Sequence, residues 1–193
     1  MNTTDGIECL STGYAGDRVE ETPAEYVIAR PTVYLDTTIP SFLTAWKSQN
    51  PERERRQRVT REWWKLHRWQ FDIRVSDHVL EEAYKGDPTA VRERKEVLES
   101  LKMVERKPGV DELAGKLKIG CGLAENADMD AHHIALAAMH ALKFLLTWNY
   151  RHMANDVLRP KMMHICRKAG YDCPRIVTPD EIMRLHTHVQ PRS

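Results

Sequence analysis

The chain has 193 residues, of which 41% are hydrophobic and 30% are charged, and its formal net charge is +1. This length and composition are typical of one soluble globular domain, and the near-neutral charge gives no global basic field that would attract nucleic acid. No apolar run approaches the roughly 18 residues that a membrane span needs, and the N-terminal stretch has neither the basic nor the apolar region of a secretory signal.

The cysteines favour a reducing environment. The four are Cys9, Cys121, Cys166 and Cys173, and no pair has the C-x-x-C spacing of a redox or zinc motif. A disulfide framework is not expected in a chain of this size. We therefore expect reduced thiols in a cytoplasmic protein with no membrane association.

Apolar patterning predicts alternating strands and helices. Residues 1–30 are rich in Thr, Gly, Asp and Glu without apolar periodicity, and we predict a flexible extension there. Short apolar runs predict strands at residues 33–35, 73–76, 143–147 and 175–177. Apolar spacing and capping residues predict helices at residues 39–48, 51–70, 77–86, 87–100, 112–119, 130–142 and 160–168 and from residue 179 onward.

Strands that alternate with helices predict an α/β fold with a mainly parallel sheet. Functional sites of such folds form at the edge where the carboxyl ends of the strands lie. In the stretch VYLDTTIP, residues 33–40, an apolar strand ends directly on Asp36. We therefore expect Asp36 at that edge of the sheet.

Other polar side chains are expected at the same edge. Asn149 follows the strand at residues 143–147. Asp130 lies in the first turn of a helix that must run antiparallel to the strands, so its start meets their carboxyl ends. Glu81 and Glu82 lie roughly 8–9 Å along the helix that follows the second strand, and apolar periodicity does not choose between them.

Three carboxylates and one amide oxygen from separate segments indicate a divalent cation site. Mg²⁺ prefers a few carboxylates and keeps several waters. Two carboxylates about 4 Å apart repel by about 4 kcal/mol at an effective dielectric constant of about 20. A cation removes this penalty and can activate water for attack on a phosphodiester.

Five segments follow one another in a characteristic order: YLDTTIPSFLTA, VSDHVLEEAYKGDP, DMDAHHIALAA, FLLTWNYRHMAN and CPRIVTPDEIM. Together they resemble the PIN-domain family, and in particular its VapC-type toxin ribonucleases, over about residues 31–183. The family's spacing of glutamate and glycine selects Glu82, four residues before Gly86, over Glu81. The third segment selects Asp130 over Asp128.

The resemblance implies a PIN-like three-layer sandwich over residues 31–187, followed by a flexible tail at residues 188–193. Its central sheet is expected to be mainly parallel, with four or five strands flanked by helices. The implied activity is that of an endoribonuclease that depends on Mg²⁺ or Mn²⁺. Family members are often homodimers and are often inhibited by a cognate antitoxin.

The resemblance also implies roles for the four polar residues. Asp36 and Asp130 match metal-binding acids, Glu82 matches an acid that ligates the metal or orients water, and Asn149 completes the site. Many active members carry aspartate where this chain has Asn149. The loss of one negative charge predicts weaker metal binding.

Substrate contacts are expected from hydroxyls beside the acids and from arginines on the helix at residues 51–70. These residues are Thr37, Thr38, Thr147, Arg55, Arg56 and Arg58. Arginines beside the tryptophans of this helix suit an RNA backbone and its bases. A solvated helix with i,i+4 ion pairs and buried tryptophans explains the same pattern.

Other interpretations stay open. Asp36 and Asp130 suit helix caps, Glu82 suits a solvated helix face, and Asn149 suits a turn; only their agreement favours a site. A PIN-fold module that binds RNA or protein without cleaving it is one alternative function. A phosphotransferase with Asp36 as nucleophile is another, although Thr38 breaks its usual D-x-D signature.

Overall fold

A five-stranded parallel sheet forms the centre of the structure, a computed structural model that describes residues 29–187. Its strands are β1 (Thr32–Leu35), β2 (Asp72–Val75), β3 (Lys102–Met103), β4 (Phe144–Leu146) and β5 (Arg175–Val177), in the order β3-β2-β1-β4-β5. Every neighbouring pair is parallel. All carboxyl ends therefore lie along one edge, as the sequence predicts.

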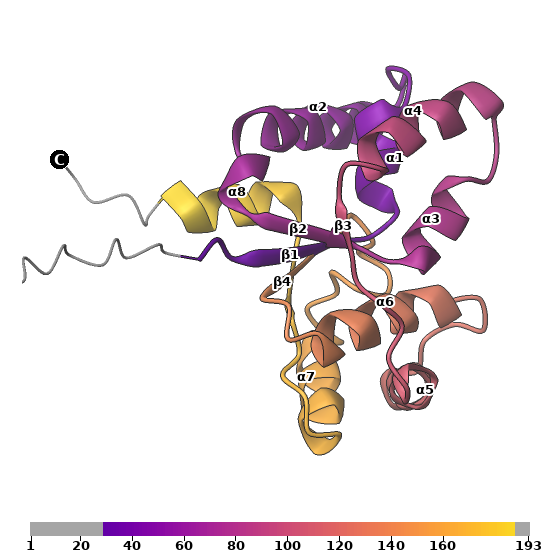
Figure 1. Ribbon diagram of the computed structural model, residues 1–193, viewed down its shortest axis with the longest axis vertical. Helices are drawn as coiled ribbons and strands as arrows, with labels where there is room; N and C mark the ends of the chain where they lie inside the picture. Colours follow the sequence, from indigo (N-terminus) through magenta and orange to yellow (C-terminus); the bar gives the residue numbers. More distant parts are fainter. Residues whose placement is uncertain (1–28, 188–193) are drawn as a thin grey trace, which may run out of the picture.

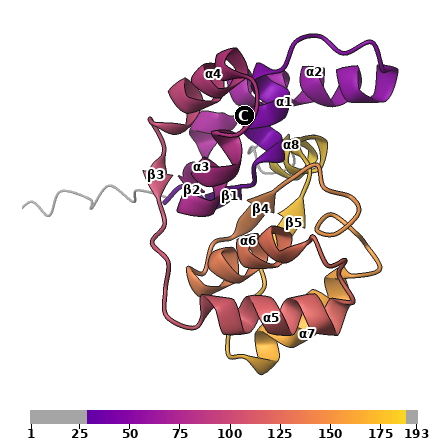
Figure 2. The same cartoon turned by 90° about the vertical axis from the view of Figure 1, so that its right-hand side faces the viewer.

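Helices cover both faces of the sheet, as Figures 1 and 2 show. One face carries α1, α2, α4 and α8, and the other carries α5, α6 and α7. This arrangement confirms the expected three-layer sandwich with a parallel central sheet. The helices are α1 (Thr38–Thr44), α2 (Pro51–Leu66), α3 (Asp77–Ala83), α4 (Pro88–Leu98), α5 (Val110–Cys121), α6 (Asp128–Met139), α7 (Arg159–Lys168) and α8 (Pro179–Thr187), with a 3₁₀ turn η1 (Arg68–Gln70).

Two elements differ from the sequence-based expectation. The strand β3 consists of two exposed residues at the sheet's edge and has no apolar pattern that could reveal it. The helix predicted over residues 51–70 ends at Leu66, because His67 leaves helical backbone geometry, and η1 follows. The apolar stripe therefore stops at buried Trp63, while Leu66 and Trp69 are 51% and 63% exposed.

The central strands are buried on both faces. Val33, Tyr34 and Leu35 of β1 and Leu145 and Leu146 of β4 have no exposed surface. Parallel strands covered by helices on both sides read as continuous apolar runs. This burial explains why β1 and β4 are the easiest strands to find in the sequence.

The helix α6 brings small residues close to the core. Its buried residues include Ala131, Ala135, Ala137 and Ala138, and it packs against α5 (Figure 1). Alanine is also the strongest helix former, so the same residues favour the helix and its close packing. The start of α6 lies toward the edge of the sheet at which the strands have their carboxyl ends.

The segment that follows β4 is fastened to α2. Trp148 is 2% exposed, and its Nε1 donates to the Thr60 hydroxyl at 2.7 Å. The Thr60 hydroxyl in turn donates to the Arg56 carbonyl at 2.7 Å. A buried indole N–H without an acceptor would cost about 1–3 kcal/mol, so this bond fixes the segment.

Several sequence-based expectations concern the ends of the chain. Most of the predicted extension at residues 1–30, the predicted tail at residues 188–193 and Cys9 lie outside the described residues. Within the described part, Cys121, Cys166 and Cys173 are free. No helix in that part has both the length and the apolar character to cross a membrane.

Candidate active site

Asp36 lies at the carboxyl end of the central strand. Its backbone N–H donates to the Leu146 carbonyl at 3.2 Å, and its side chain is buried, at 2% residue exposure. Oδ1 accepts from the backbone N–H of Thr38 at 2.9 Å and from the Thr38 hydroxyl. Oδ2 accepts from the Thr147 hydroxyl at 2.8 Å. Strand geometry and two threonines thus fix the carboxylate in place.

Burial raises the pKa of Asp36 to about 6, because the carboxylate loses contact with water. The charge of His133 and the hydrogen bonds from Thr38 and Thr147 lower this pKa and offset part of the effect. These neighbours therefore do not fully offset the cost of burying the negative charge of Asp36. A cation bound nearby would stabilise that charge.

The two threonines also tie the ends of β1 and β4 together. The Thr38 hydroxyl accepts from the Trp148 N–H at 2.9 Å, and the Thr147 hydroxyl accepts from the Asn149 N–H at 2.9 Å. Each hydroxyl therefore donates to Asp36 and accepts from the segment after β4. In this structure their hydroxyls are used to hold the site together.

Glu82 reaches the site from α3. Its Oε2 accepts from the Thr37 hydroxyl and from Nε2 of His133 at 3.2 Å. These two contacts, that of His133 foremost, lower the pKa of Glu82, although partial burial opposes them. The neighbouring Glu81 has a 66% exposed side chain and lies 3.9 Å from His78. The structure thus turns Glu82, and not Glu81, toward Asp36.

Asp130, in the first turn of α6, pairs with a histidine that sequence reasoning missed. Its Oδ2 lies 2.6 Å from Nδ1 of His152. Asn149 accepts the His152 backbone N–H through Oδ1 at 3.1 Å, and its carbonyl accepts from Met153 and Ala154. Asn149 therefore shapes the turn that aims His152 at Asp130.

One chain of contacts joins all four predicted residues. Asp36 is linked through Thr147 to Asn149, and Asn149 is linked through His152 to Asp130. Glu82 joins this chain through Thr37, the neighbour of Asp36. The four residues come from separate segments, and these contacts link their segments along the same edge of the sheet.

His133 is the other site residue whose role the sequence did not specify. It lies on α6 three residues after Asp130, a spacing that places both on one helix face. It is 1% exposed and contacts both Glu82 and Tyr34. Its place in the segment DMDAHHIALAA, three residues after Asp130, was the signal that the sequence offered.

The donor chemistry fits a hard divalent cation. Carboxylate oxygens are the ligands that Mg²⁺ prefers, and one or two carboxylates with waters suffice. Asp36 and Asp130 carry carboxylates of this kind. Within residues 29–187, no three His, Cys, Asp or Glu side chains stand close enough to hold a metal ion by themselves. Waters would therefore supply the remaining ligands.

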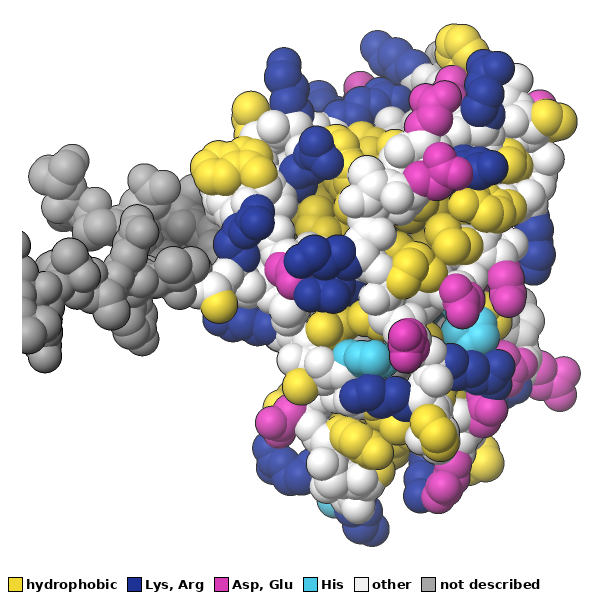
Figure 3. Space-filling view, in the orientation of Figure 1, with side chains coloured by type: hydrophobic (Ala, Val, Ile, Leu, Met, Phe, Trp, Pro, Cys, Tyr) yellow, Lys and Arg dark blue, Asp and Glu magenta, His cyan; other side chains and the backbone are white. Residues whose placement is uncertain are grey.

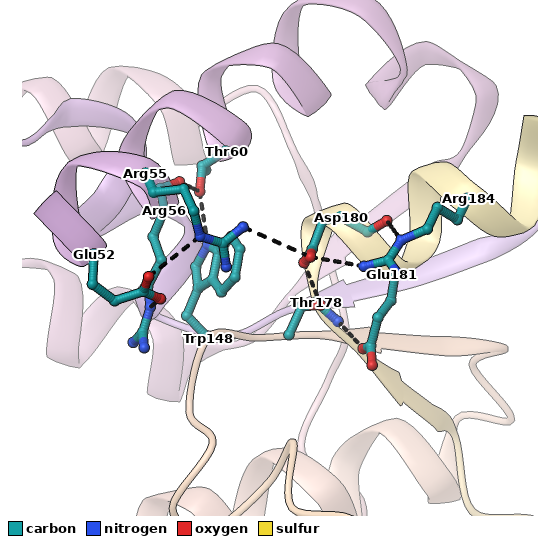
Figure 4. Close-up of polar contacts among 9 residues, drawn as sticks. All are labelled: Glu52, Arg55, Arg56, Thr60, Trp148, Thr178, Asp180, Glu181 and Arg184. Atoms are coloured by element: carbon teal, nitrogen blue, oxygen red, sulfur yellow. Dashed lines mark hydrogen bonds and ion pairs between the residues drawn. The ribbon is translucent and has the colours of Figure 1, made fainter.

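The arginines of α2 lie beside the segment after β4 (Figure 4). Arg55 and Arg56 bind Glu52 at 3.3 and 3.0 Å, and Arg55 lies 3.9 Å from Asp180 of α8. Both guanidinium groups stand 5.8 Å from the Trp148 ring. Their charges therefore border the site but are partly paired with acids.

The remaining basic and aromatic side chains of this region vary in exposure. Arg58 is exposed. Trp63 is buried and Trp69 is exposed. The interpretation with buried tryptophans therefore holds for Trp63 but not for Trp69. Figure 3 shows Lys and Arg interspersed with acidic side chains over one face of the molecule. This distribution agrees with the near-neutral net charge.

The fold is that of VapC-type PIN-domain toxins. The sarcin–ricin loop cleaving toxin VapC20 of Mycobacterium tuberculosis matches with a TM-score of 0.50 and 16% identity, over 64% of this chain and 95% of that chain. VapBC2 from Rickettsia felis, bound to a DNA fragment from their promoter, matches with a TM-score of 0.51 and 15% identity, over 76% of this chain and 98% of that one. No family model and no curated sequence matches this chain.

The raised pKa of Asp36 predicts a pH dependence of stability. The folded state holds this proton more tightly than the unfolded state, so stability falls as pH rises from about 4 through about 6. A shift of about two units corresponds to about 3 kcal/mol. We expect Asp36→Asn to remove this loss, so that in urea denaturation with EDTA the variant gains stability over the wild type between pH 4 and pH 7.

Asp172→Asn provides the control, because it removes a carboxylate from an exposed position. Its stability should follow the wild type across the same pH range. Parallel curves for Asp36→Asn and the wild type would show that burial does not perturb Asp36.

Proposed function

We propose that this chain is a metal-dependent endoribonuclease that hydrolyses RNA phosphodiester bonds. The observation that carries the proposal is the buried Asp36 carboxylate, held at the carboxyl end of the central strand with Glu82 and Asp130 at the same edge. The VapC-type fold supports it, since VapC20 is a toxin that cleaves the sarcin–ricin loop.

In this proposal Asp36 and Asp130 would hold Mg²⁺ or Mn²⁺, with Thr38 and Thr147 orienting Asp36. A divalent cation bound there would supply a Lewis acid beside the phosphodiester and offset its developing negative charge. Glu82 would accept a proton from the attacking water or orient it. Asn149 would position His152 against Asp130 or complete the shell around the site.

The finer biological role is also a proposal. The chain would act as the toxin of a type II toxin–antitoxin system, as a homodimer inhibited by a cognate antitoxin. The likeness to VapBC2 supports this role. Arg55, Arg56 and Arg58, with Thr37, Thr38 and Thr147 at the site, would contact the RNA substrate.

A second candidate function is RNA or protein binding without cleavage. Asn149 favours it, because this residue lacks the negative charge of an aspartate and its Oδ1 already accepts a backbone N–H from His152. A site that binds its cation weakly could retain RNA affinity and lose turnover. Metal affinity distinguishes the two functions.

The first test is a titration of wild type and Asp36→Asn with Mn²⁺ and Mg²⁺, followed by calorimetry and by cleavage of a mixed RNA pool. We expect metal binding and metal-dependent cleavage in the wild type and the loss of both in the variant, because the variant lacks the carboxylate. Metal binding without cleavage would favour the binding function. No metal binding in the wild type would overturn the nuclease proposal.

Asn149→Asp should tighten metal binding. An added carboxylate about 4 Å from a divalent cation gains about 2 kcal/mol even in bulk water, so we expect affinity to rise about tenfold or more. Asn155→Asp adds the same charge farther along the same loop and is the control. Equal affinities of Asn149→Asp and Asn155→Asp in calorimetry would place Asn149 outside the cation's shell.

Replacing Arg55, Arg56 and Arg58 by Gln should weaken RNA binding and its salt dependence. Each lost phosphate contact to a single strand lowers the slope of log K against log salt by about 0.7, so three contacts predict a change of about 2. Fluorescence anisotropy at several salt concentrations would measure it. Arg92→Gln, at an exposed position on α4, is the control, and an unchanged slope in the triple variant would assign its arginines to a solvated face.

A further inference from the structure

We propose that Ser76, Tyr34 and His133 form a buried hydrogen-bond chain that fixes Oε2 of Glu82. The other oxygen of this carboxylate, Oε1, is then the one that binds water or a cation at the site. His133 is then a positioning residue for Glu82. The inference rests on the proposed nuclease function. It adds that the two oxygens of the Glu82 carboxylate have different roles, one structural and one at the reacting centre.

The hydrogen-bond chain connects the sheet to the site through three contacts. The Tyr34 hydroxyl lies 2.6 Å from Oγ of Ser76 and 2.8 Å from Nδ1 of His133. Nε2 of His133 lies 3.2 Å from Oε2 of Glu82. Tyr34 is fully buried, His133 is 1% exposed and Ser76 is 2% exposed. These hydrogen bonds are therefore shielded from exchange with bulk water.

The donor and acceptor properties of these groups determine the direction of each hydrogen bond. An ionised carboxylate only accepts hydrogen bonds, so the 3.2 Å contact between Nε2 of His133 and Oε2 of Glu82 requires a proton on Nε2. In the neutral imidazole Nδ1 then accepts, and the Tyr34 hydroxyl donates to it. The Tyr34 oxygen in turn accepts from Ser76. One tautomer of His133 therefore satisfies every member.

Both donors to Glu82 bind the same oxygen. The Thr37 hydroxyl and His133 contact Oε2, and no described residue donates a hydrogen bond to Oε1. The side chain of Glu82 keeps 31% of its surface exposed. Oε1 is therefore free to bind water or a cation, while Oε2 fixes the direction in which Oε1 points.

A merely structural role explains these contacts less well. Phenylalanine would fill the position of Tyr34 in a core strand without a hydroxyl to satisfy, since buried polar groups need partners. The hydroxyl instead joins a chain that ends on a site carboxylate. Partners of this kind change metal affinity about 10- to 100-fold when they are removed.

The test compares three variants that separate the steps of the chain. His133→Gln keeps an amide donor that can reach Glu82, whereas the shorter side chain of His133→Asn cannot reach it. Tyr34→Phe keeps the ring and removes only the hydroxyl that donates to Nδ1 of His133. Tyr171→Phe removes the hydroxyl of a half-buried tyrosine in the loop after α7 and is the control.

The first readout needs no metal and no substrate. ¹⁵N NMR of metal-free protein at pH 8 should show His133 as the Nε2–H tautomer in the wild type and in Tyr171→Phe. Tyr34→Phe should keep this tautomer, because Glu82 still accepts from Nε2–H, but its Nδ1 resonance should shift, because Nδ1 has lost its hydrogen-bond donor. A mixture of tautomers in the wild type, or an unchanged Nδ1 resonance in Tyr34→Phe, would overturn the inference.

The second readout is Mn²⁺ affinity by calorimetry beside RNA cleavage. We expect His133→Asn to bind 10- to 100-fold more weakly, His133→Gln to recover most of the affinity, and Tyr34→Phe to lose about fivefold, equivalent to one net hydrogen bond. If the wild type binds Mn²⁺ and cleaves RNA while His133→Gln and His133→Asn lose affinity equally, the inference is overturned and the proposed function stands. A wild type without metal binding would overturn the proposed function, and the tautomer would still decide the inference.

Discussion

The burial of one carboxylate at the end of the central strand governs the arrangement around it. Asp36 is 2% exposed, and burial raises its pKa to about 6, so its charge must be stabilised by neighbours. Thr38 and Thr147 provide donors from two different strand ends. Because each of these hydroxyls also accepts a backbone N–H, the stabilisation of Asp36 and the pairing of β1 with β4 are inseparable.

The sequence predicts the fold and the edge of the sheet at which the four polar residues lie, because both follow from strong, local patterns. Buried parallel strands read as apolar runs, and Asp36 and Asn149 follow two such runs directly. The reversal of direction between α6 and β4 then places Asp130 at the same edge. The choice of Glu82 over Glu81 required a resemblance, because both residues flank the buried face of α3, and so did the choice of Asp130 over Asp128 at the start of α6.

Contacts that depend on loop geometry could not be predicted in this way. His152 lies in a turn without periodicity, and its approach to Asp130 depends on the Asn149 carbonyl groups that shape the turn. The strand β3 has two exposed residues and forms through pairing with Val75 and Arg74. Trp69 shows the opposite failure, since its spacing indicates burial but the helix ends before it.

The alanines of α6 set the geometry of the site from a distance. Asp130 and His133 are rigidly linked on this helix, so the packing of α6 against its neighbours fixes where both side chains lie. The buried alanines at residues 131, 135, 137 and 138 contribute to that packing, and α6 contacts α5 above all. The placement of two site residues therefore depends on side chains that carry no charge, and a larger side chain among them would shift the helix without altering a single candidate ligand.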